Sequence, residues 1–412
     1  MSEKFKEEIN PQNIKKVEMA VCIPSYNEAD SISYPVKQAD EGICKYFSDK
    51  SCVIINCDNN SPDNTRDVFL QTDTKTPKIY ISTPPGIKGK GNNFKNMFQK
   101  VVDLKAKTIV VVDADLKSIT PEWIKHLGEP LYNGFSYVAP LYVRHKYDGT
   151  ITNGIAYPVT RSLYGRRVRQ PIGGDFGFNG KLAKVYLSHE LWNDAVANFG
   201  IDIWMTTIAI TQRVRICQSF MGRPKIHRTK DPGAQLGPMF RQVVGTIFFM
   251  MSYFESSWIK IKYSRPTAIF GFGLGDVEMP PRVDVNTENL WNRFHAGFSD
   301  YKDIWKEILS KNVYLKLLEI QNMREWEFNL PTDLWARLLF DVAVSYRDAL
   351  VDRDLMLDSI IPLYFGRTLS FVKATKSMSI SQAEQAIEDD CMTFETTKPY
   401  LIKRWKETRQ SE

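Results

Sequence analysis

The sequence lacks several features that would assign a protein to a large functional class. Lys and Arg (54) outnumber Asp and Glu (48) only slightly, and no dense basic block suggests a nucleic-acid-binding arm. We find no run of about 20 apolar residues, the length that a membrane-spanning helix needs. The apolar segment 243–254 is shorter and predicts a buried core helix. We therefore expect no nucleic-acid partner and no membrane span.

Other absences narrow the choice further. The six cysteines have no spacing typical of a metal finger, so we expect them to be reduced and mostly buried. The first residues, MSEKFKEE, are charged and polar, which predicts a cytoplasmic protein without an export signal. No Walker A loop or Gly-x-Gly-x-x-Gly fingerprint is present, which argues against P-loop kinases and dinucleotide-binding enzymes.

The first half of the chain alternates strand-like and helix-like segments, and the last part reads as helices only. The βαβα order predicts an α/β fold with a mostly parallel, doubly wound sheet. Glycine and proline cluster at 271–281, after which helical spacing dominates. We therefore expect an α/β domain over residues 1–280 and a mainly helical region over 281–412. The expected strands are 19–23, 51–56, 78–82 and 108–112.

The most informative motif is Asp113-Ala114-Asp115, which follows the expected strand 108–112 directly. Ligands of open α/β sheets bind outside the carboxyl ends of the strands, so both carboxylates are expected at a binding crevice. Carboxylates suit a divalent cation, which in turn suits a diphosphate. Taken alone, the motif could equally be a helix cap ahead of Thr120-Pro121.

Further polar segments follow other strands or open helices. Tyr26 and Glu28 come after the first strand, where they could contact a nucleoside, and Asn59 follows the second. Lys90 stands between two glycines at a helix start, where backbone N–H groups and an ammonium can meet phosphate. In isolation, the Lys90 loop would be a surface turn and His227 an ordinary surface or core histidine.

Together, these segments resemble the GT-A class of nucleotide-sugar glycosyltransferases. Within that class, the chain resembles the retaining enzymes that make glucosylglycerate, mannosylglycerate and glucosyl-3-phosphoglycerate. The resemblance covers about residues 19–230, and its most specific element is Gln170-Pro-Ile-Gly-Gly-Asp175. It implies a GT-A fold with a C-terminal mainly helical region. It also implies metal-dependent transfer of glucose or mannose from a UDP- or GDP-linked donor, giving a compatible solute.

The resemblance also implies a role for each matched residue. Asp202, Lys90 and Asp115 would be catalytic, with Asp202 orienting the sugar and the acceptor hydroxyl rather than forming a covalent intermediate. Asp115 and His227 would ligate Mg²⁺ or Mn²⁺. The donor would be bound by Pro24, Tyr26, Glu28, Asn59, Lys90, Asp113, Ala114 and Asp115. The acceptor would be bound by Thr152, Ile172, Gly173, Gly174 and Asp202.

The acceptor is either D-glycerate or 3-phosphoglycerate. In relatives that use 3-phosphoglycerate, the loop corresponding to 148–152 carries an arginine where this chain has Thr150. Losing that bidentate cation favours D-glycerate, although Arg161, Arg166, Arg167 or Arg169 could bind a phosphate instead. A nucleotidyltransferase and a catalytically idle nucleotide-sugar sensor remain alternatives from other classes. A homodimer is one option for the oligomeric state.

Overall fold

The computed structural model describes residues 5–227, 232–271 and 277–407. The chain divides into two compact units, each built from separate stretches of sequence. The first unit comprises residues 1–144, 168–232 and 267–280, and the second comprises 145–167, 233–266 and 281–412. Two segments that the sequence places before residue 280, 145–167 and 233–266, therefore pack with the C-terminal helices.

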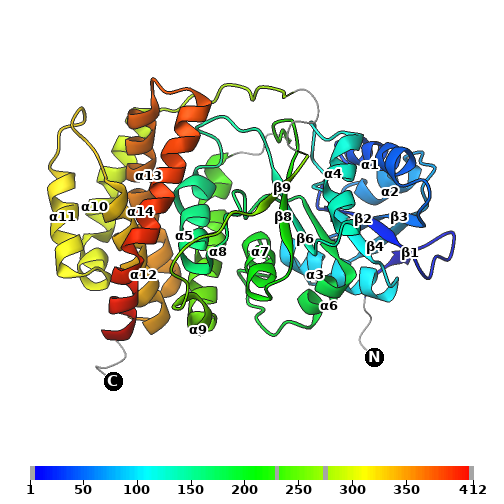
Figure 1. Ribbon diagram of the computed structural model, residues 1–412, viewed down its shortest axis with the longest axis horizontal. Helices are drawn as coiled ribbons and strands as arrows, with labels where there is room; N and C mark the ends of the chain where they lie inside the picture. Colours follow the sequence, from blue (N-terminus) through cyan, green and yellow to red (C-terminus); the bar gives the residue numbers. More distant parts are fainter. Residues whose placement is uncertain (1–4, 228–231, 272–276, 408–412) are drawn as a thin grey trace. The chain divides into compact units, whose positions relative to one another are not determined.

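Within the described residues, the first unit contains one sheet of nine strands (Figure 1). The strand order is β1-β4-β3-β2-β5-β7-β6-β8-β9. Most neighbours are parallel, but β1 pairs antiparallel with β4, and β7 pairs antiparallel with both β5 and β6. The sheet is therefore mostly parallel, as predicted. The strands are β1 (Glu8–Ile9), β2 (Met19–Ser25), β3 (Cys52–Asp58), β4 (Lys78–Ser82), β5 (Thr108–Val111), β6 (Tyr137–Leu141), β7 (Phe176–Asn179), β8 (Ile216–Phe220) and β9 (Ala268–Phe270).

The central strands explain the apolar runs of the sequence. Every residue of β2 and β5 is buried, as expected for parallel strands covered on both faces. The expected strand 19–23 continues for two more residues, because Pro24 and Ser25 stay in register with Cys57 and Asp58 of β3. The polar segment after β2 therefore begins at Tyr26.

Helices cover both faces of this sheet. In Figure 1, α1 and α4 lie on one side of the strands, and α3 and α6 lie on the other. Trp123 and Ile124 of α4 join Val36 and Ile43 of α1 in one hydrophobic cluster with alternate residues of β2 and with one residue of β5, Val110. The helices of this unit are α1 (Ser33–Tyr46), α2 (Thr65–Gln71), α3 (Lys90–Asp103), α4 (Pro121–Tyr132), α6 (Gly180–Ser188) and α7 (Ile201–Thr211).

The second unit is helical over its described residues. In it, α10 packs against α13, and α14 packs against α5 and α12. The predicted C-terminal helices are present as α12 and α14. Helix α12 ends at Asp348, and Ala349 after it adopts a left-handed φ of 51°. The helices are η1 (Thr152–Ala156, a π-helix), α5 (Tyr157–Tyr164), α8 (Pro232–Tyr253), α9 (Glu255–Trp258), α10 (Thr287–Ile308), α11 (Lys311–Gln321), α12 (Thr332–Asp348), α13 (Arg353–Thr375) and α14 (Ile380–Glu407).

Two apolar helices of this unit, α8 and α13, bear on whether the chain contains a membrane-spanning helix. The segment 243–254 belongs mostly to α8, where Val244, Phe248 and Met251 are buried, as a core helix requires. By length and composition, α13 is the one helix of the described residues that could cross a membrane. However, 67% of its apolar window is buried, as in the core helix of a globular unit.

Candidate active site

The candidate site lies in the first unit, at the carboxyl ends of β2, β3 and β5. These strands end at Ser25, Asp58 and Val111, and Asp113 follows two residues after the last of them. Because the three strands are parallel neighbours, their ends meet at one edge of the sheet. The fold thus brings the polar segments singled out from the sequence to a common edge.

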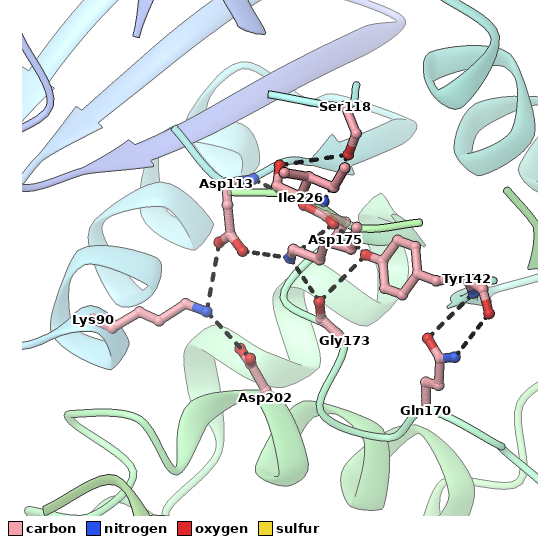
Figure 2. A network of polar contacts seen from close by, with 10 residues as sticks. Lys90, Asp113, Ser118, Tyr142, Gln170, Gly173, Asp175, Asp202 and Ile226 are labelled. Carbon is pink, nitrogen blue, oxygen red and sulfur yellow. Dashed lines mark hydrogen bonds and ion pairs between the residues drawn. The ribbon is translucent and has the colours of Figure 1, made fainter. Parts of the chain in front are cut away.

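Five charged side chains form a lysine–carboxylate cluster at this edge, made of Lys90, Asp113, Asp175, Asp202 and Lys225. Figure 2 shows Lys90 between two carboxylates: its Nζ lies 3.1 Å from Asp202 Oδ2 and 3.6 Å from Asp113 Oδ1. Lys225 Nζ lies 2.6 Å from Asp113 Oδ2 and 2.9 Å from Asp175 Oδ2. Two ammonium groups therefore alternate with three carboxylates.

Burial and charge act in opposite directions on these groups. Burial alone would raise the pKa of Asp113, but the ammonium groups of Lys225 and Lys90 hold it well below its ordinary value. Burial dominates at Asp202 and Asp175, whose pKa values are raised despite the lysines. Burial would lower the pKa of Lys90 and Lys225, yet the carboxylates raise both. The cluster therefore holds Asp113 as an anion beside two cations.

The Lys90 loop is tightly packed rather than a loose surface turn. Helix α3 begins at Lys90, and the N–H of Gly91 donates to Asn198 O at 3.2 Å. A Cβ on Gly91 would lie 1.8 Å from Val196 O, so only glycine allows this close approach. Phe94 and Met97 anchor the helix in the core. The close packing of the Gly91 backbone thus holds Lys90 at the edge of the sheet.

Asp202 lies in the first turn of α7, two residues after the N-cap residue Gly200. One of its oxygens, Oδ2, accepts a hydrogen bond from Lys90 Nζ. The other oxygen, Oδ1, is buried and has no hydrogen-bond partner among the described residues. A buried carboxylate oxygen in this state can accept a hydrogen bond from a polar ligand, such as a hydroxyl group.

The residues predicted to bind a nucleoside have differing environments. Tyr26 is 49% exposed and offers an aromatic face, whereas Pro24 and Asn59 are buried. Glu28 is also buried, and its carboxylate accepts a hydrogen bond from Ser31 Oγ at 2.7 Å. With its amide turned to satisfy its neighbours, Asn59 accepts from the N–H of Gly89 at 2.8 Å. Asn59 therefore connects the end of β3 to the Lys90 loop.

The predicted metal ligands lie on two adjacent segments. Leu116 and His227 form an isolated antiparallel bridge, and Lys117 N donates to Ile226 O at 2.8 Å. Asp115 is buried on one of these segments, and His227 is exposed on the other. Within the part of the chain that the structure describes, no group of three or more His, Cys, Asp or Glu could hold a metal ion.

The predicted acceptor residues fall into both units. Ile172, Gly173 and Gly174 belong to the loop before β7, next to the lysine–carboxylate cluster. Gly173 O accepts a hydrogen bond from Lys225 Nζ at 2.8 Å. Ala114, which was predicted to bind the donor, is buried between Asp113 and Asp115. Thr152 is buried on η1 and belongs to the second unit.

The sequence predicted no role for three members of the polar network: Lys225, Asp175 and Tyr142. Tyr142 OH donates to Asp175 Oδ2 and to Gly173 O, in the latter case at 3.3 Å. Asp175 ends the Gln-Pro-Ile-Gly-Gly-Asp run, which was a signal for its involvement. Lys225 lies two residues before His227, a position that a single sequence does not mark.

Comparison with known proteins gives one family match. Residues 20–186 match the model of Glycosyl transferase family 2. No curated protein matches the sequence significantly. Glucosyl-3-phosphoglycerate synthase from Mycobacterium tuberculosis is similar in structure, as solved with Mn²⁺, UDP and glucosyl-3-phosphoglycerate. It is 22% identical, with a TM-score of 0.46, over 57% of this chain and 79% of that chain. The same protein with Mn²⁺, UDP-glucose and glycerol 3-phosphate gives a TM-score of 0.45 at 22% identity, with the same coverage.

Proposed function

We propose a specific glycosyl transfer for this chain. The chain is a glycosyltransferase with a GT-A fold, and its residues 20–186 match the model of Glycosyl transferase family 2. It transfers glucose or mannose, with retention of configuration, from a UDP- or GDP-linked donor to D-glycerate. The observation that carries the proposal is the position of Lys90 between Asp113 and Asp202 at the carboxyl edge of the sheet.

Lys90 has the chemistry that the departure of a diphosphate requires. Negative charge builds on the diphosphate as the glycosidic bond breaks, and a fixed ammonium stabilises that charge. The carboxylates of Asp113 and Asp202 raise the pKa of Lys90, so it stays protonated although its side chain is partly buried. The closely packed start of α3 holds it there.

Asp202 is suited to orienting hydroxyl groups. Its Oδ1 is buried without a hydrogen-bond partner among the described residues, while Oδ2 is held by Lys90. We assign it to the sugar or acceptor hydroxyl. The acceptor then attacks from the face that the diphosphate leaves, and a diphosphate oxygen takes the proton. No covalent glycosyl–enzyme intermediate is needed on this route.

Asp115 and His227 are the residues that would hold Mg²⁺ or Mn²⁺. They lie on segments joined by the Leu116–His227 bridge, and a carboxylate oxygen suits both ions. The ion would supply further charge stabilisation for the leaving diphosphate.

Two observations in the second unit support D-glycerate over 3-phosphoglycerate. Thr150, at the position of the expected phosphate-binding arginine, is hydrogen-bonded through its hydroxyl to Tyr364. Arg161, one of the arginines that could have replaced it, is 1% exposed and pairs with Glu388 and Glu395 at 2.5 and 2.6 Å. An arginine saturated by two carboxylates is a poor phosphate ligand.

A donor and acceptor matrix tests the proposal. The protein is incubated with UDP- and GDP-linked glucose and mannose, each with D-glycerate or 3-phosphoglycerate and Mg²⁺ or Mn²⁺. NMR of the product identifies the anomer, and an α-linked glycosylglycerate is expected. Preference for 3-phosphoglycerate would replace the acceptor, and a β-linked product would exclude retention. Release of pyrophosphate from a nucleoside triphosphate and a sugar phosphate would instead indicate a nucleotidyltransferase.

A further inference from the structure

Lys225 joins two parts of the site that lie far apart in the sequence. Its side chain is only 7% exposed, and its Nζ has three oxygen partners. Two are carboxylate oxygens, Asp113 Oδ2 at 2.6 Å and Asp175 Oδ2 at 2.9 Å. The third is the carbonyl of Gly173 at 2.8 Å. One ammonium therefore holds the donor-side Asp113 and the acceptor-side loop together.

The acceptor-side loop fits closely around this contact. Gly174 has a φ of 82°, and a Cβ there would lie 2.5 Å from Asp113 Oδ2 and 2.8 Å from Lys225 Nζ. The loop therefore rests directly on the ion pair, and its backbone position depends on where Lys225 and Asp113 lie. A side chain larger than hydrogen at position 174 would separate them.

Asp175 also contacts both Asp113 and Lys225. It is completely buried, and its Oδ1 accepts from the N–H of Asp113 at 2.9 Å, while its Oδ2 accepts from Tyr142 OH and pairs with Lys225. A carboxylate with this many partners has little capacity left for a substrate. Its role is to fix the backbone of Asp113 and the side chain of Lys225.

We propose that Lys225 is a positioning residue that sets the distance between the donor phosphates and the acceptor. By occupying Asp113 Oδ2, it leaves Oδ1 facing Lys90; by binding Gly173 O, it holds the loop of Gly173 and Gly174 at that edge. This inference rests on the proposed glycosyl transfer. Misplacing bound reactants by about 1 Å can cost about 100-fold in rate, so the expected effect is large.

The test compares Lys225→Met with Lys100→Met in the full-length protein. Lys100 is a matched control, because its side chain is also 7% exposed and pairs with a carboxylate, that of Glu8, away from the site. We expect Lys225→Met to lower kcat for transfer to D-glycerate about 100-fold, with the Kd of UDP or GDP changed less than about fivefold. Lys100→Met should change kcat less than about twofold.

If the two variants have equal kcat values, the proposal is overturned. It is also overturned if Lys225→Met weakens only the binding of UDP or GDP and leaves kcat unchanged. If Lys225→Met does not fold, Gly174→Ala decides, since it crowds the same contact while keeping the charge. An unchanged kcat in that variant would overturn the proposal. Should the wild-type protein transfer none of the sugars, the proposed function fails separately. Hydrogen exchange at the Asp113 amide then tests positioning, and unchanged protection in Lys225→Met would refute it.

Discussion

Lys90→Ala is the most direct probe of the lysine–carboxylate cluster. The substitution removes the only described ammonium that contacts Asp202, and it leaves Asp113 paired with Lys225. Asp113 therefore keeps its position, whereas Asp202 loses its cation. The structure predicts a defect in chemistry with little change in the surrounding backbone.

The expected loss follows from the role of the ammonium. Removing one donor that stabilises developing negative charge costs about 2.7–4 kcal/mol at the transition state, or about 100- to 1000-fold in kcat. A second effect concerns Asp202. Burial already raises its pKa and Lys90 opposes this, so the pKa rises further in the variant. The acidic limb of the pH–kcat profile should therefore move to higher pH.

Steady-state kinetics over a range of pH, with donor and acceptor varied separately, measures both effects. Lys88→Ala serves as the control, because Lys88 is an exposed lysine two residues away in the same loop. A raised donor KM with unchanged kcat would show that Lys90 only binds the ground state. Unchanged kinetics in a folded variant would refute a role for Lys90 altogether.

Three other predictions concern the metal, the acceptor and the second unit. EDTA should abolish transfer, and Mg²⁺ or Mn²⁺ should restore it. Asp115→Ala and His227→Ala should each lose most of the activity while staying folded. An enzyme that stays active in EDTA would exclude a role for the ion in transfer. Thr150→Arg should shift the ratio of kcat/KM toward 3-phosphoglycerate, whereas a fixed ratio would show that this loop does not select the acceptor. Arg161→Met should lower the free energy of unfolding by about 3 kcal/mol in urea titrations, because two carboxylates lose their cation; a loss below 1 kcal/mol would contradict this.

Local patterns predicted the parts of the site that depend on neighbouring residues. The apolar run from Thr108 placed Asp113 at a strand end, and the two glycines around Lys90 predicted a helix start. Both features follow from burial and backbone geometry within about ten residues. They are present in the structure as expected.

Contacts between distant segments could not be predicted in this way. Lys225 meets Asp113 across 112 positions of sequence, and nothing in its own neighbourhood marks it as buried. The helix α5 likewise shows an apolar face, but periodicity does not say which helix covers it. Its partner is α14, more than two hundred residues later, and a pattern confined to neighbouring residues cannot mark that contact.

The pairing of Arg161 with Glu388 and Glu395 has a consequence for synthesis on the ribosome. Residues 145–167 leave the exit tunnel long before α14 exists, and at about 5–20 residues per second the delay exceeds ten seconds. During that interval the guanidinium of Arg161 lacks the two carboxylates that accompany it inside the finished unit. The second unit can therefore complete its folding only after α14 has been made, and stop codons before residue 388 would leave α5 exposed to proteases and chaperones.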